Sequence, residues 1–117
     1  MTNKMQTGSQ GENAAAEYLV KKGYEVLERN YRYRRAEVDL IVRKKNWLVF
    51  VEVKTRTGNA FGFPEEFVNR EKEENILSAA EEYMYKIDWQ GNVRYDIVSV
   101  LGTGVDREIA HFEDAFY

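Results

Sequence analysis

Residues 37–55 of the chain read EVDLIVRKKNWLVFVEVKT, and this stretch decides the fold. It contains two apolar runs rich in β-branched residues, separated by the short polar connection Lys44-Lys45-Asn46. Such a pattern is typical of two antiparallel strands joined by a hairpin turn. Both runs are apolar on both faces near the turn, which predicts a hairpin that is central in its sheet and covered on both sides.

The turn also predicts which residues of the hairpin lie opposite one another. A loop of two or of four residues gives the same register, and in that register Asp39 faces Glu52 and Glu37 faces Lys54. Because strand residues alternate between faces, Glu37, Asp39 and Ile41 are expected on one face of the first strand. Val38, Leu40 and Val42 are then expected on the other face.

The rest of the chain supplies two helices and three further strands. Helical spacing predicts a helix from Glu12 to Val20, preceded by Gly8-Ser9-Gln10-Gly11 and ended by Gly23. A second helix is expected from Asn69 to about Lys86, after a Gly-containing loop at 57–64. Strands are predicted at 24–33, 92–101 and 108–112. The order α-β-β-β-α-β-β favours a single α/β domain over 1–117, with a mixed central sheet flanked by helices.

Composition excludes several classes of protein. The 117 residues include no Cys and one His, which argues against disulfide frameworks, thiol nucleophiles, iron–sulfur clusters and the common zinc sites. His111 lies outside the predicted clusters and is interpreted as a structural or surface residue. The longest apolar run, 47–51, is too short to span a bilayer. The expectation is a cytoplasmic protein with no membrane partner.

The net charge of −3 conceals an uneven distribution. Residues 20–58 carry 11 basic and five acidic groups, a net charge of +6, whereas the remainder carries −9. A local basic block can bind phosphates even within an acidic protein, because the local field attracts the ligand. The competing interpretation is a set of solvated strand and turn positions, which charge alone favours.

The predicted Asp39–Glu52 pair is the main chemical signal. Two carboxylates that face each other on covered strands repel and are costly to bury. A divalent cation removes that conflict, and Mg²⁺ prefers such oxygen ligands. Lys54 shares the face of Glu52 and could orient or activate metal-bound water. A salt-bridge cluster with Lys54 and nearby arginines explains the same residues equally well, so both interpretations stay open on chemistry alone.

A wider pattern of motifs occurs around this pair and resembles one known family. Asp39 followed by the Glu52-Val53-Lys54 tripeptide looks like the PD-(D/E)xK motif of restriction-endonuclease-like nucleases. The whole ordered set resembles the YraN-like family of small bacterial proteins, which is similar to archaeal Holliday junction resolvases. The set comprises Gly11-Glu12, Arg29-Asn30-Tyr31, Glu37 to Ile41, Phe50 to Arg56, Phe61-Gly62, Lys72, Arg94-Tyr95-Asp96 and Ala115-Phe116.

The resemblance implies a restriction-endonuclease-like core and assigns roles position by position. Asp39 and Glu52 would bind the metal together with the backbone carbonyl of Val53, and Lys54 would be the catalytic lysine. Glu12 would match a helical glutamate of the resolvase-like site, and Glu37 the acidic residue two before the aspartate. The chain departs from the pattern at Ala36, where the family usually has Gly, and it lacks a Pro before Asp39.

Several basic residues around the site are candidates for phosphate contacts. They are Arg32, Arg34, Arg35, Arg56 and Lys72, and surface solubility is the alternative role for each. Phe61 and Phe63 could stack on nucleic acid, although packing of the loop is the commoner use. Arg94 and Asp96 share a strand face and are expected to pair.

The leading hypothesis is a Mg²⁺-dependent endonuclease that acts on DNA, including branched or nicked DNA, with Mn²⁺ as a substitute metal. A non-catalytic nucleic-acid-binding module on the same scaffold is the alternative, and an adaptor with an ionic cluster is a weaker one. A homodimer is compatible with the resolvase resemblance, but the sequence specifies no interface.

Overall fold

The computed structural model describes residues 4–56, 70–102 and 107–116. They form two helices and a five-stranded sheet, in the chain order predicted above. The elements are α1 (Lys4–Lys21), β1 (Glu25–Tyr33), β2 (Ala36–Lys44), β3 (Trp47–Arg56), α2 (Arg70–Lys86), β4 (Asn92–Leu101) and β5 (Glu108–Phe112). The predicted loop at 57–64, with Phe61 and Phe63, and the predicted helix start at Asn69 lie outside the described residues.

The strands lie in the sheet in the order of the sequence, β1-β2-β3-β4-β5. β3 and β4 are parallel and the other neighbours are antiparallel, so the sheet is mixed. The predicted hairpin register is confirmed from Lys44–Trp47 to Leu40–Val51. β3 is therefore paired along its length with β4 and near the turn with β2, and it is a central strand, as its apolar sequence indicates.

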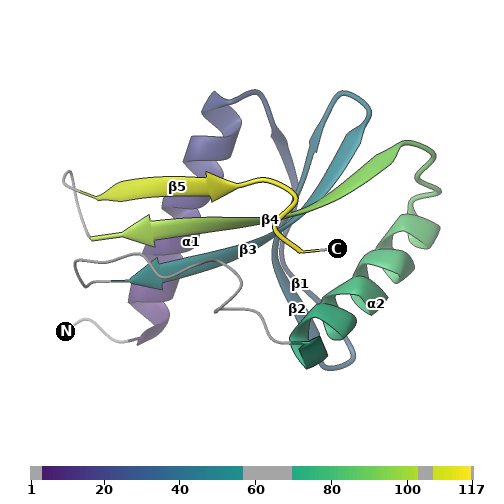
Figure 1. The fold of residues 1–117 in the computed structure, drawn as a ribbon, viewed down its shortest axis with the longest axis horizontal. Helices are drawn as coiled ribbons and strands as arrows, with labels where there is room; N and C mark the ends of the chain where they lie inside the picture. Colours follow the sequence, from purple (N-terminus) through teal and green to yellow (C-terminus); the bar gives the residue numbers. More distant parts are fainter. Residues whose placement is uncertain (1–3, 57–69, 103–106, 117) are drawn as a thin grey trace.

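The helices lie on opposite faces of the sheet (Figure 1). α1 packs chiefly over β3 and β4, and α2 packs over β2 and β1. Along β3, Leu48 and Phe50 face α2, whereas Val49, Val51 and Val53 face α1. This alternation places Glu52 and Lys54 together on the α2 face, as expected for these two residues. None of the helices in these described segments is long and apolar enough to cross a membrane.

The first helix begins earlier than predicted. α1 starts at Lys4 and runs through Gly8 and Gly11, which were interpreted as a non-helical lead. Gly11 has a tertiary reason to be glycine, because a Cβ there would lie 2.1 Å from Oγ1 of Thr55. The glycine lets α1 approach β3 closely beside the candidate site, and helix propensity alone does not reveal this.

The predicted faces of β2 are wrong at one position. Val38 packs with Ile41 in the core under α2, whereas Leu40 packs in the core under α1. The regular alternation is therefore broken at Asp39. Opposite this point Asn30 of β1 has a φ of 53°, a left-handed conformation that locally distorts the strand pair. The irregularity lies at the aspartate on which the functional hypothesis depends.

Candidate metal-binding site

Asp39 lies where the strands of the hairpin separate. The β2–β3 ladder ends at Leu40–Val51, so within the described segment 36–56 Asp39 and Glu52 are not ladder partners. Instead, Oδ2 of Asp39 accepts a hydrogen bond of 2.8 Å from the backbone N–H of Val53. The carboxylate thus satisfies a donor that a backbone carbonyl would satisfy in a continued ladder. This bond ties the side chain to the adjacent strand.

Glu52 is nearly buried and is held on one side by two lysines. Its exposed fraction is 5%. Nζ of Lys72, from the first turns of α2, lies 2.7 Å from Oε1 of Glu52, and Nζ of Lys54 lies 3.5 Å from the same oxygen. The other oxygen, Oε2, is buried and has no hydrogen-bond partner among the residues that the structure describes. A buried acceptor in this state is costly unless something further binds it.

Burial and the neighbouring charges shift the pKa values of three groups at this site. The pKa of Asp39 is raised to about 7, chiefly by burial and next by the negative charge of Glu52, with a smaller contribution from Glu12 and against the opposing hydrogen bond from Val53. Burial also lowers the pKa of Lys54, despite the attraction of Glu52. For Lys72, burial acts to lower the pKa, but the hydrogen bond and the negative charge of Glu52, together with Lys54 and Asp39, outweigh burial and leave the pKa raised. Such perturbations are common at functional sites.

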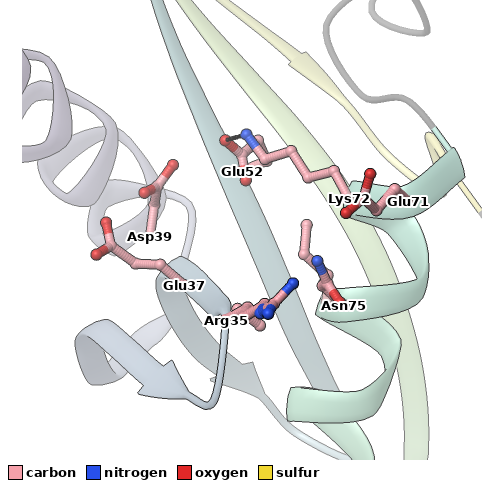
Figure 2. A pocket seen from close by; sticks show the side chains of 9 residues that line it. Arg35, Glu37, Asp39, Glu52, Glu71, Lys72 and Asn75 are labelled. Atoms are coloured by element: carbon pink, nitrogen blue, oxygen red, sulfur yellow. Dashed lines mark hydrogen bonds and ion pairs between the residues drawn. The ribbon is translucent and has the colours of Figure 1, made fainter.

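Asp39 and Glu52 open into one cavity of about 330 Å³, which we call the acidic cavity (Figure 2). It lies between β2, β3 and the first two turns of α2, and Lys72 reaches across it to Glu52. Its described lining has four carboxyl groups and two cations, so these residues would repel an anion entering alone. The lining residues are Arg35, Ala36, Glu37, Asp39, Glu52, Glu71, Lys72, Asn75 and Ile76.

The donors of the acidic cavity fit a hard divalent cation. Asp39 and Glu52 offer carboxylate oxygens, one of them the unpartnered Oε2, and Mg²⁺ usually takes one or two carboxylates and several waters. The N–H and C=O of one strand residue point to the same edge. The Val53 carbonyl therefore points, like its N–H, toward the open side where Asp39 lies. Within the described part of the chain, no three acidic or histidine side chains converge as a fuller ligand set.

The other predicted acids lie around this pair. Glu12, on α1, is close enough for its charge to raise the pKa of Asp39. Glu37 lines the acidic cavity but pairs with Arg32 of β1 at 2.7 Å. It is not a ladder partner of Lys54, because the β2–β3 ladder of the described hairpin ends before that point.

The predicted phosphate contacts are spread more widely. Arg35 and Lys72 line the acidic cavity, and Arg34 lies in the adjoining turn with its guanidinium 5.3 Å from the Tyr33 ring. Arg32 is exposed and paired with Glu37, and Arg56 lies at the far end of β3 opposite Leu101. The structure therefore brings two of the five to the acidic cavity.

Sequence reasoning missed the contribution of α2. Glu71, Asn75 and Ile76 line the acidic cavity, and Lys72 was considered for phosphate rather than for Glu52. The available signal was the spacing Lys72-Asn75-Ile76, which places these residues on one helical face. Which face meets β3 depends on the crossover connection, and the local sequence does not specify that.

His111 also needs a correction. It does not lie outside every cluster: its side chain is 2% exposed and Nε2 lies 2.7 Å from Oδ2 of Asp96. Nδ1 lies 2.9 Å from Nζ of Lys22. The predicted Arg94–Asp96 pair is confirmed at 2.8 Å. These residues form a buried network on the α1 face, which fits the structural role considered for His111.

Comparison with known protein sequences shows the family to which the chain belongs. Residues 11–100 match the model of the Uncharacterised protein family UPF0102. The chain belongs to this family. A UPF0102 protein of Flavobacterium psychrophilum is 44% identical over 94% of this chain and 92% of its own length. A Rhodococcus opacus member is 42% identical over 99% and 100%, and a Phocaeicola vulgatus member 36% over 100% and 97%. The resemblance to the YraN-like proteins is confirmed at the level of this UPF0102 family.

Proposed function

We propose that this UPF0102 protein is a metal-dependent endonuclease that hydrolyses phosphodiester bonds in DNA, on a restriction-endonuclease-like core. One observation carries the proposal: two desolvated carboxylates share a cavity, and one buried oxygen of Glu52 has no partner within segments 4–56, 70–102 and 107–116. A fold that needed only stability would not retain this arrangement. A divalent cation satisfies the free oxygen and relieves the repulsion between Asp39 and Glu52.

The residues in and beside the acidic cavity would then have separate roles in the reaction. Asp39, Glu52 and the carbonyl of Val53 would hold Mg²⁺, or Mn²⁺ in its place. The bound ion supplies Lewis-acid activation of the phosphate and of water. Lys54, whose pKa is lowered by burial, lies beside Glu52 and is positioned to hold or move a proton at Nζ. Lys72 and Arg35 are placed to neutralise the non-bridging oxygens of a phosphate.

A non-catalytic DNA-binding module remains a second candidate. Its supporting observation is that Lys72 and Lys54 already neutralise one oxygen of Glu52 without a metal. Such an ion-pair cluster can be purely structural. This alternative predicts salt-sensitive binding to DNA with no dependence on Mg²⁺ or Mn²⁺.

The deciding experiment is a cleavage panel of branched, nicked, duplex and single-stranded DNA with Mg²⁺, Mn²⁺ or EDTA. Asp39→Asn and Glu52→Gln should each lower cleavage at least about a hundredfold, because each removes a direct metal ligand. DNA binding measured in EDTA should persist in both variants. The matched controls are Asp88→Asn and Glu74→Gln. Both change exposed carboxylates that do not line the acidic cavity.

Calorimetry provides a readout that does not depend on the substrate. Wild-type protein should bind Mn²⁺ with heat that Asp39→Asn abolishes and Asp88→Asn retains. Undiminished cleavage by purified Asp39→Asn protein would reject the nuclease assignment. Mn²⁺-independent DNA binding with no cleavage of any substrate would favour the binding module.

A further inference from the structure

The acidic cavity continues into a second cavity. The second one has a volume of about 240 Å³, and we call it the arginine cavity. The two cavities share Arg35, Ala36 and Asn75 as a common wall. The arginine cavity is completed by Tyr33, Arg34 and Ser78. Together they form one groove that leads away from Asp39 and Glu52.

The groove runs between α2 and the turn that joins β1 to β2. Lys72, Asn75 and Ser78 follow one another at three-residue spacing and so lie along one face of α2. That helical wall spans about 9 Å, at 1.5 Å of rise per residue. The opposite wall descends from Asp39 through Arg35 to Tyr33. A ligand bound along the groove would therefore contact both walls over several ångströms.

The charge of the lining changes sign along the groove. Among the described residues, the acidic cavity is lined by four carboxyl groups and two cations. The described lining of the arginine cavity has two arginines, Arg34 and Arg35, and no carboxyl group. A ligand with one end at a metal-bearing acidic site and negative charge along its length matches this gradient. A phosphodiester chain has that form.

The arginine cavity also offers a surface for a planar ring. Tyr33 packs against the core under α2 and remains partly exposed at the cavity. The Arg34 guanidinium lies 5.3 Å from the centre of its ring. Proteins that hold unpaired strands combine a positive groove with aromatic rings or arginine planes on which bases stack. Bases inside a duplex are already stacked, so this surface can be used only by an unpaired base.

We propose that this groove binds an unpaired strand of DNA, with a base on Tyr33 and Arg34 and the following phosphate directed toward Asp39 and Glu52. The inference deepens the proposed nuclease function and rests on it for the chemistry at the acidic end. The substrate class is then DNA with a single-stranded segment, such as a flap or an overhang. Asn75, at the junction of the two cavities, has both a donor and an acceptor for a base edge.

Binding in EDTA tests the groove separately from catalysis. Fluorescence anisotropy should compare a blunt duplex with the same duplex carrying a single-stranded overhang, at one fixed salt concentration. We expect at least about tenfold tighter binding of the overhang substrate, because stacking of even one base contributes about that much. Equal affinity for the two substrates would overturn the proposal.

Variants assign the preference to the groove. Tyr33→Ala should lose about tenfold in overhang binding with little change for blunt duplex, and Tyr33→Phe should retain the ring and the binding. Tyr85→Ala is the matched control, because Tyr85 lies on α2 with 90% of its surface exposed and lines neither cavity. Equal losses in Tyr33→Ala and Tyr85→Ala would contradict the assignment.

A second position covers the case in which Tyr33→Ala fails to fold. Ser78 is an exposed residue of α2, so Ser78→Glu should fold and place a negative charge in the arginine cavity. It should weaken overhang binding several-fold, whereas Ser78→Thr should not. Cleavage with no preference for unpaired strands would reject this inference alone. Selective binding of unpaired strands without any cleavage would reject the nuclease function and leave the groove assigned.

Discussion

Asp39 and Asp96 are both desolvated aspartates of the central sheet, and their surroundings are opposite. Asp96 is fully buried and accepts hydrogen bonds from Arg94, from the backbone N–H of Asp114 and from His111. Burial alone would raise the pKa of Asp96, but these partners outweigh it and leave the pKa lowered. Asp39 has one backbone donor and a second carboxylate beside it, and its pKa is raised to about 7.

The difference separates a carboxylate whose charge the fold compensates from one whose charge it leaves largely uncompensated. The fold supplies Asp96 with enough donors to make its charge stabilising. It leaves Asp39 and one oxygen of Glu52 short of partners at the edge of a cavity. Burial alone therefore does not identify a candidate functional acid. Burial with too few hydrogen-bond donors or cations around the carboxylate is the better indicator.

The largest expected effect concerns removal of each carboxylate. Asp96→Ala should lower the free energy of unfolding by about 3–5 kcal/mol, because it leaves Arg94 and His111 buried without their partner. Asp39→Ala should change it by about 1 kcal/mol or less, because the lost hydrogen bond is offset by relief of repulsion. Urea unfolding at pH 7 in EDTA measures both. Similar losses of unfolding free energy in the two variants would contradict the distinction drawn between Asp39 and Asp96.

A smaller effect concerns pH. The folded state holds the Asp39 proton up to about pH 7, whereas the unfolded chain releases it near the ordinary value of 3.8. The folded state therefore binds more protons between these values, and stability falls as pH rises through this window. Asp96 has a lowered pKa, so its contribution is present above the ordinary value and is lost as pH falls.

The variant Asp39→Asn isolates this titration. Its stability relative to wild type should rise by roughly 1–3 kcal/mol between about pH 4 and pH 7 and then level off. Urea midpoints in EDTA at several pH values give the profile. A flat difference across this range would show that Asp39 is not perturbed as described.

The smallest effect concerns the cations beside each acid. Lys72→Met should cost about 1 kcal/mol or less, because Lys72 is partly exposed and Lys54 still lies beside the same Glu52 oxygen. Arg94→Met should cost several times more, because Arg94 donates two hydrogen bonds to Asp96, which is fully buried. Thermal unfolding of the two variants side by side measures the ratio. A larger loss of stability for Lys72→Met than for Arg94→Met would indicate that the ion pair of Glu52 mainly stabilises the fold.

The sequence predicts the hairpin well because its determinants are local. Turn length and alternation specify the register, and the structure confirms it as far as Leu40–Val51. The order of elements and the mixed sheet follow from the helix placed between two strands. The candidate pair Asp39 and Glu52 could be predicted for the same reason, because both residues belong to the hairpin.

The errors occur where a long-range contact decides the outcome. Gly11 was placed before the first helix, yet it lies within α1, where the close approach to Thr55 leaves no room for a side chain. Val38 was assigned to the wrong face, and the distortion at Asn30 that lies opposite this point belongs to the neighbouring strand. The position of His111 depends on the register between β4 and β5, in which it pairs with Val98. None of these contacts leaves a periodic signal in its own segment.

The crossover by α2 has a consequence for the order in which the chain folds. Asp39 and Glu52 are 13 residues apart and come together as soon as the hairpin closes, which is a fast local event. Lys72 reaches Glu52 only when α2 docks and β4 pairs with β3, which are slower steps of greater sequence separation. A nascent hairpin therefore carries its repulsive acids before their counter-charge arrives. Mildly acidic solution, or a divalent ion, should accelerate that early step.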